Sequence, residues 1–195
     1  LCRAAYGRFA HQAVTPLVQL DEQHWLLELF HGPTLAFKDV ALQLLGNLFE
    51  YILERRNQAQ GTHTLTVLGA TSGDTGSAAI AGLRSKAHIH IFILHPRGRV
   101  SPIQEAQMTT ILDDNVHNLA VDGTFDAAQI VSHDTGKKRL VVNINGVATR
   151  IDYNTLTDTD GVLAVADVGH ADMDTNPASA DAGWANGVWV ANGNL

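Results

Sequence analysis

The fold of this chain is decided by residues 64–94, which read TLTVLGATSGDTGSAAIAGLRSKAHIHIFIL. The apolar run at 64–68 leads into a loop rich in glycine and hydroxyl residues. A helix of small residues at 78–83 follows, and then a second apolar run at 90–94. A strand, a loop, a helix and a strand within about 30 residues form a βαβ unit with parallel strands and a right-handed crossover. We therefore expect an α/β sheet here.

The residues before this unit predict a hairpin and a long helix. Residues 17–30 alternate short apolar runs with turn residues, which is typical of two strands joined by a tight turn. Apolar residues then recur at helical spacing from Phe37 to about Arg56. We expect residues 57–61 to close that helix.

The residues after the unit continue the same pattern. Ser101 and Pro102 are typical of a helix start, with proline in the first turn, and that helix is expected to end near Leu112. Residues 118–121 then predict a further strand. The predicted fold class is α/β, an open and mostly parallel sheet with flanking helices.

Composition excludes several classes of protein. The chain has 195 residues, 45% hydrophobic and 17% charged, which argues against intrinsic disorder. Its one cysteine excludes a disulfide framework or a four-cysteine zinc site and fits a reducing compartment. A net charge of −7 argues against nucleic-acid binding, and no apolar run approaches the roughly 18 residues of a membrane span. We expect a soluble cytoplasmic protein; the sequence leaves its oligomeric state open.

The charge is distributed unevenly along the chain. After Leu140 there is one basic residue, Arg150, against seven aspartates, so this stretch holds −6 of the net −7. The step predicts two regions, an α/β portion at 1–130 and an acidic tail at 131–195 that is irregular or β-rich. Within the tail, residues 140–144 and 162–166 are the expected strands.

Two acidic clusters of the tail contain side chains of the types that bind metals. Residues 158–161 resemble the start of a calcium loop, but the later ligands and the closing Glu are absent, so a plain turn is expected. His170, Asp172 and Asp174 are spaced closely enough to bind a metal, although a solvated acidic loop is the better interpretation. No metal is predicted.

The loop at 71–77 is a candidate anion site. It lies where a strand ends and a helix begins, the edge at which open α/β sheets bind ligands. Free N–H groups at a helix N-terminus attract phosphate or carboxylate, and Gly73 and Gly76 allow a ligand to approach the backbone. Because Ser, Asp and Thr are also common helix caps, simple capping explains the loop equally well.

Lys38 is a candidate catalytic amine. It lies at the first turn of the predicted helix, where the helix dipole disfavours a cation. If the amine is buried, its pKa should fall, which is the condition for a Schiff-base lysine. The alternative is a surface lysine paired with Asp39 or Glu28.

Three segments together resemble one known family. Residues 30–39 are similar to the segment of threonine synthases that carries the cofactor lysine, residues 68–80 to their Thr-Ser-Gly-Asp-Thr-Gly loop, and residues 96–110 to a third family segment. The segments occur in the family's order, and the resemblance continues to about Asp126. It covers roughly residues 1–130.

The resemblance implies a lyase of threonine biosynthesis with pyridoxal phosphate as cofactor, in the tryptophan-synthase-beta-like fold type II. Such an enzyme converts O-phosphohomoserine and water to threonine and phosphate. Lys38 would link to the cofactor aldehyde and move protons once substrate releases it. The cofactor-binding residues would be Lys38, Ser72, Asp74 and Thr75. The substrate-binding residues would be Thr71, Ser72, Gly73, Thr75, Arg97 and Arg99, the two arginines being equally consistent with solvated loop residues.

The resemblance is incomplete, and alternatives stay open. The family's Gly/Asn-rich loop for the cofactor phosphate is not found, since the Asn-Gly pairs at 186–187 and 192–194 lack a strand-to-helix setting. We therefore expect an incomplete enzyme in this chain. Another fold-type-II enzyme, such as a threonine or serine dehydratase or a cysteine synthase, is one alternative, although related enzymes often have Asn where Asp74 stands. A non-catalytic binding or scaffold fragment is the other.

Overall fold

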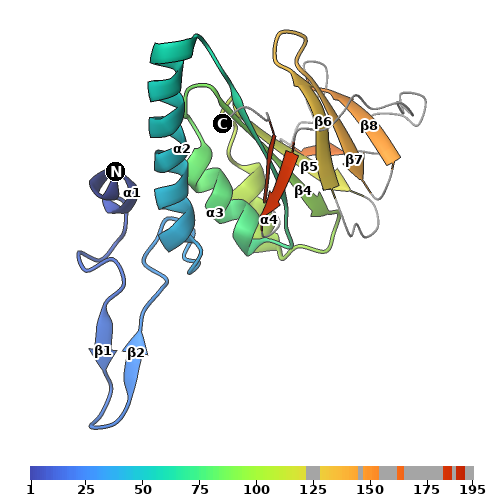
Figure 1. The fold of residues 1–195 in the computed structure, drawn as a ribbon. Helices are drawn as coiled ribbons and strands as arrows, with labels where there is room; N and C mark the ends of the chain where they lie inside the picture. The colour runs from blue at the N-terminus through green and yellow to red at the C-terminus, as the bar shows by residue number, and fades with distance from the viewer. Residues whose placement is uncertain (122–127, 145–146, 154–161, 165–181, 186–187, 192–195) are drawn as a thin grey trace.

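The computed structural model arranges the chain in three layers (Figure 1). Helices cover one face of a central sheet, and an antiparallel meander covers the other. No helix among the described residues is long and apolar enough to cross a membrane. The residues described are 1–121, 128–144, 147–153, 162–164, 182–185 and 188–191.

The central sheet has six strands in the order β10-β11-β3-β4-β5-β9. The βαβ unit supplies its centre, where β3, β4 and β5 run parallel; β9 is parallel to β5, and β11 is antiparallel to β3. The expected open, mostly parallel sheet is confirmed. The bounds are Leu65–Ala70 for β3, Ile89–Pro96 for β4, Val116–Val121 for β5, Val162–Ala164 for β9, Ala182–Ala185 for β10 and Val188–Ala191 for β11.

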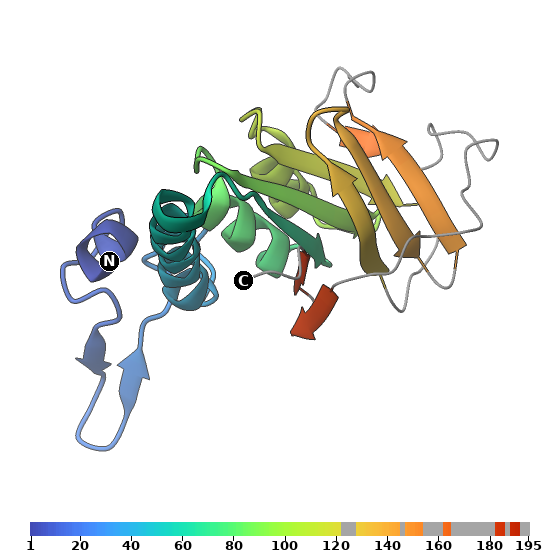
Figure 2. The same cartoon turned by 45° about the horizontal axis from the view of Figure 1, so that its top comes forward.

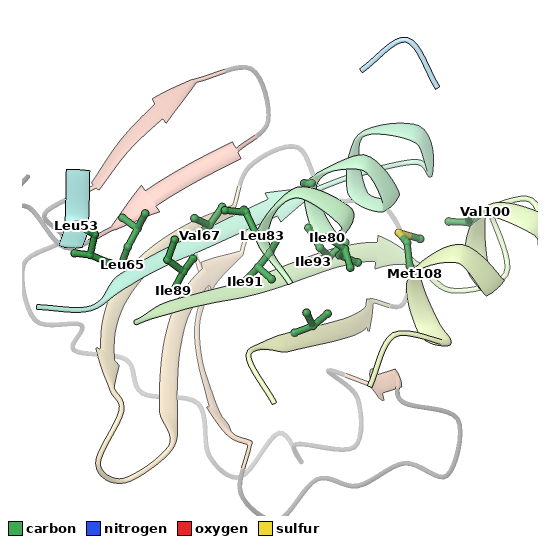
Figure 3. Packing of buried hydrophobic residues seen from close by; sticks show 12 residues of the cluster. Leu53, Leu65, Val67, Ile80, Leu83, Ile89, Ile91, Ile93, Val100 and Met108 are labelled. Carbon is green, nitrogen blue, oxygen red and sulfur yellow. The ribbon is translucent and has the colours of Figure 1, made fainter. Parts of the chain in front are cut away.

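Three helices pack on one face of this sheet: α2 (Asp39–Gln60), α3 (Asp74–Leu83) and α4 (Pro102–Thr109). Ile91 and Ile93 of β4 point into this layer and pack with Met108 of α4 (Figure 3). Because the side chains of a strand alternate between faces, the residues on either side of Ile91 and Ile93 point toward the opposite layer.

The first long helix ends inside the closing segment predicted at 57–61, but only at its last residue. Residues 57–60 continue α2, which ends before Gly61 at a φ of 89°. Alanine and glutamine are good helix formers, so nothing in this stretch stops the helix. Glycine adopts a positive φ without steric cost, and the helix therefore ends there.

Helices α2 and α3 touch backbone to backbone. A Cβ atom added to Gly46 of α2 would lie 2.1 Å from the carbonyl oxygen of Gly82 in α3, and one added to Gly82 would lie 2.5 Å from the carbonyl oxygen of Leu42. Contacts this short are sterically forbidden, so both positions require glycine. This crossing sets the distance between the first half of α2 and the C-terminal end of α3.

We predict that Gly46→Ala lowers the free energy of unfolding by about 1–3 kcal/mol, because the added methyl group forces the helices apart. In an isolated helix the same change would be stabilising by about 1 kcal/mol. A loss of stability in the protein would therefore show that the two helices touch at Gly46. Urea unfolding followed by circular dichroism measures the effect. The exposed Gln58→Ala on the same helix is the control, and a Gly46→Ala protein as stable as wild type would contradict the close packing.

The second face of the sheet is covered by strands that begin just before the acidic tail and continue into it. The meander consists of β6 (Ala128–Asp134), β7 (Arg139–Ile144) and β8 (Val147–Asp152), all antiparallel. Leu140, Val142 and Ile151 of the meander pack against Leu68, Phe92, Leu94 and Leu119 of the sheet.

The strand expected at 140–144 is present as β7. The strand expected at 162–166 is present as β9 over residues 162–164, and residues 165–166 lie outside the described part. The tail is thus β-rich where it is described, and three of its strands, β9, β10 and β11, extend the sheet of the first region. The proposed division at residue 130 stays a prediction. The weighed turns and metal clusters, at 158–161, 170–174, 186–187 and 192–194, lie outside the described residues.

Three histidines and a tyrosine lie between the sheet and the meander. The His90 and His133 ring centroids are 5.2 Å apart, and those of His117 and Tyr153 are 4.5 Å apart. His133 shares hydrogen bonds with the Thr66 hydroxyl at 2.5 Å and the Tyr153 hydroxyl at 2.8 Å. In the part of the chain that the structure describes, no group of His, Cys, Asp or Glu is placed to hold a metal ion.

These rings are neutral at pH 7. Burial, together with smaller effects of the nearby His90, His133 and Lys138, lowers the pKa of His117 to about 3. Burial lowers the pKa of His133 to about 4, helped by His90 and opposed by Asp134. The pKa of His90 is lowered by burial and by Lys138. We name these three residues the histidine cluster.

The N-terminal segment stands away from the sheet. The predicted hairpin is confirmed as β1 (Leu17–Gln19) paired antiparallel with β2 (Trp25–Leu27), and it projects from the rest of the molecule in both views (Figures 1 and 2). The short helix α1 (Cys2–Tyr6) packs on α2, where the Tyr6 hydroxyl donates a hydrogen bond to the Val40 carbonyl at 3.0 Å.

Candidate active site

The two loops predicted to carry chemistry meet at the carboxyl end of β3. Lys38 directly precedes α2, and its amine donates a hydrogen bond to the hydroxyl oxygen of Thr75, the second residue of α3. The lysine is half-buried. Its pairing with Asp39 or Glu28, the alternative, is not what the structure shows, because Glu28 bonds His31 at 2.6 Å and Asp39 is occupied elsewhere.

Asp39 organises the loop that leads to Lys38. Its side chain is fully buried and accepts hydrogen bonds from the backbone N–H of Thr34 at 2.8 Å and from the Thr34 hydroxyl at 2.9 Å. It also accepts one from the amide of Gln43 at 3.2 Å. A Cβ atom on Gly32 would lie 2.3 Å from the Asp39 Cβ, so the loop wraps tightly around this carboxylate.

The glycine-rich loop is shaped from inside by Thr71. Its buried hydroxyl accepts hydrogen bonds from the backbone N–H groups of Gly73 at 2.9 Å and Gly76 at 3.0 Å. Gly73 has a φ of 145°. The N–H groups of Asp74 and Thr75 belong to the first turn of α3 and have no acceptor within the helix. They are therefore available to an anion, which the helix dipole also favours. Ser72 and Asp74 are exposed beside them.

Helix α4 closes the site from a third side. Its expected start is confirmed, since the Ser101 hydroxyl accepts the N–H of Gln104 at 3.4 Å. The Gln104 side chain donates to the Asp74 carboxylate, and that of Gln107 donates to the Thr34 carbonyl at 3.2 Å. The sequence singled out neither glutamine, because one amide among polar helix residues carries no pattern.

The two arginines lie on the adjoining loop between β4 and α4. Both side chains are exposed. The backbone N–H of Arg97 donates a hydrogen bond to the Val121 carbonyl at 3.0 Å. They share the carboxyl edge of the sheet with Thr75. The structure thus brings Lys38 and Thr75 into contact and leaves Arg97 and Arg99 at the surface of the neighbouring loop.

His95, at the same end of β4, was also missed. Its side chain is fully buried on the helix-covered face, and neither ring nitrogen makes a hydrogen bond among the described residues. Burial lowers the pKa of His95 and Arg97 lowers it further, against Glu105 and the Pro96 carbonyl, which raise it. The ring is neutral at pH 7.

Comparisons with known proteins give one consistent result. No protein-family model matches the sequence. A threonine synthase of Eremothecium gossypii is 52% identical over 161 residues, covering 75% of this chain and 31% of that protein. The crystal structure of PLP-bound threonine synthase from Brucella melitensis is 54% identical, with a TM-score of 0.57 over 63% of this chain and 25% of that one. Yeast threonine synthase is 46% identical, with a TM-score of 0.60 over 87% of this chain and 31% of that one.

The chain therefore resembles threonine synthases in sequence and in fold, as the three segments predicted. It spans less than a third of the length of these relatives. The comparisons assign no role to any single residue.

Proposed function

We propose that this chain carries the reactive lysine and the anion-binding loop of a threonine-synthase-like enzyme that uses pyridoxal phosphate. The premise is its similarity to threonine synthases over two-thirds or more of its sequence. The observation that carries the proposal is the hydrogen bond from the Lys38 amine to Thr75, which places an amine against the N-terminus of α3. The proposed reaction converts O-phosphohomoserine and water to threonine and phosphate.

The residues present fit the aldehyde end of this cofactor. A half-buried amine beside a hydroxyl and two helix N–H groups suits a covalent link to an aldehyde next to a bound carboxylate. When bound, pyridoxal phosphate supplies an electron sink for bonds to the substrate's α carbon. Among the described residues we assign none to the cofactor phosphate, so we expect weak affinity.

Each residue of the site has a proposed role. Lys38 holds the cofactor and, when free, accepts and returns protons at the substrate carbons. Ser72, Gly73 and Thr75, together with the N–H of Asp74, bind the substrate carboxylate. Asp74 and Thr75 also contact the cofactor.

The remaining proposed roles are less direct. The hydroxyl of Thr71 serves the substrate site by holding the backbone of the loop, since both of its contacts are to that backbone. Arg97 and Arg99 attract the anionic substrate from the loop after β4. We also propose fold type II for the whole enzyme and the cytoplasm as its location, which the single cysteine supports.

The test uses the purified chain mixed with pyridoxal phosphate. Wild type is expected to show the visible absorbance band of lysine-bound cofactor, and Lys38→Ala is expected to lack it. Lys137→Ala, which removes an exposed lysine from the turn after β6, is the matched control and should keep the band. Equal bands in wild type and Lys38→Ala would contradict the proposal.

Phosphate release from O-phosphohomoserine then tests catalysis. A band without phosphate release would favour the second candidate, a cofactor-binding fragment without activity. The observation behind that candidate is that the chain spans under a third of the enzymes it resembles.

A further inference from the structure

Two glutamines of α4 reach the two loops of the candidate site. Gln104 and Gln107 are three residues apart, so they lie on one face of the helix. Gln104 donates to the Asp74 carboxylate beside Thr75, and Gln107 donates to the Thr34 carbonyl in the loop before Lys38. One helix therefore binds a neighbour of Thr75 and the loop that leads to Lys38.

The orientation of the Gln104 amide is fixed. The Ser101 hydroxyl donates to its oxygen at 2.9 Å, so the NH₂ group is directed to Asp74. A Cβ atom on Gly73 would lie 2.3 Å from the same oxygen, which shows that the amide lies flat against the loop backbone. Rotating the amide would place an oxygen against the carboxylate and lose both contacts.

The contacts form a closed ring of bonded side chains and backbone. We call it the ring of contacts, and it runs through Lys38, Thr75, Asp74, Gln104, Gln107, Thr34 and Asp39 back to Lys38. In a closed ring each contact is held from two directions, so opening it at any point loosens all of it. Outside the ring, the Lys38 amine lies 5.7 Å from the centroid of the neighbouring Phe37 ring, on an exposed side chain.

We propose that Gln104 and Gln107 are positioning residues that hold the Lys38 amine at the Ser72–Thr75 loop. That these glutamines contribute to catalysis rests on the proposed function. Their effect on the position of the Lys38 amine does not depend on it. Neither glutamine needs to touch substrate or cofactor for this. They act through Asp74 and Thr34.

The test measures the reactivity of individual lysines in the intact chain. Lys38 is acetylated with succinimidyl acetate in wild type, in Gln104→Ala, in Gln107→Ala and in the double variant, and the rates are read by peptide mass spectrometry. Lys137 and Lys138, on the exposed turn after β6, are internal references. Gln58→Ala, an exposed glutamine of α2, is the matched control.

Each single variant is expected to speed acetylation of Lys38 alone, by about threefold to tenfold, the factor that corresponds to one lost hydrogen bond. The double variant should stay within about twofold of the single ones, because a ring that is already open gains little from a second break. In the same variants, linkage of pyridoxal phosphate to Lys38 should slow, since the freed amine is no longer held for it.

Three results would overturn the proposal. They are Lys38 rates within twofold of wild type in both single variants, single effects that multiply in the double variant, and equal acceleration of Lys137 and Lys138, which would mean general loosening. If wild type fails to link the cofactor, the proposed function fails, and the acetylation rates still decide the positioning role.

Discussion

Lowering the pH from 7 to 4 is expected to reduce the free energy of unfolding by on the order of 5 kcal/mol through His117 and His133 alone. The pKa values of these rings are about 3 and about 4 in the folded chain, against 6.5 for an ordinary histidine. Between pH 6.5 and 4 the unfolded chain binds protons on these rings and the folded chain does not. Stability is therefore complete above pH 6.5 and decreases as the pH falls below it.

The loss of stability at low pH is large enough to unfold part of the chain. A domain of this length is stable by roughly 5–15 kcal/mol, so the loss is a large share of the total. Protonation also places like charges close together, because the His90 and His133 centroids are 5.2 Å apart. We expect the meander to separate from the sheet first, since all three rings of the histidine cluster lie at that boundary.

Urea unfolding at pH 7, 6, 5 and 4 measures the dependence. His117→Phe should reduce the dependence by roughly half, since phenylalanine keeps the stacking on Phe92, whose ring centroid is 4.4 Å away, but binds no proton, whereas His133 remains. An unfolding free energy that does not vary between pH 7 and 5 would show that the rings are not buried as described.

Replacing Asp39 by alanine is expected to lower the free energy of unfolding by about 3 kcal/mol or more. The change leaves the Thr34 N–H and the Gln43 amide without their buried acceptor. It also releases the loop that precedes Lys38. Asp39→Asn keeps one acceptor oxygen and should cost less.

The measurement is again urea unfolding, with Asp114→Ala as the control because that aspartate is exposed on the loop before β5. If the Asp39 and Asp114 variants were equally stable, the buried carboxylate would not organise the lysine loop. Acetylation of Lys38 in the Asp39→Ala protein should also rise, because this substitution opens the ring of contacts at another point.

The sequence predicted the centre of the fold well because local physics determines it. The apolar runs at 64–68 and 90–94 are too short for helices, and the Gly-rich loop between them begins a helix, so periodicity alone specifies the βαβ unit. The closing segment at 57–61 was predicted, but α2 continues through most of it because only Gly61 supplies the conformation that stops the helix.

The site was predictable only in part. Lys38 and the 71–77 loop are recognisable in sequence, since a lysine in a first helical turn and a glycine-rich loop are both unusual. The contribution of Gln104 and Gln107 depends on where α4 lies in space, which no spacing reveals. The histidine cluster was also missed, because its members come from three strands: pairing of β4 with β5 brings His90 and His117 together, and His133 joins them only when the meander folds onto the sheet.

The strand order of the sheet has a consequence for synthesis on the ribosome. The central strands β3, β4 and β5 are complete by residue 121, but the strands that pair with their outer edges, β9 and β11, begin at residues 162 and 188. Throughout the interval, a nascent chain presents two open parallel-sheet edges, the kind of surface on which other chains aggregate. A chaperone that binds extended segments would be needed most while residues 122–191 are being translated.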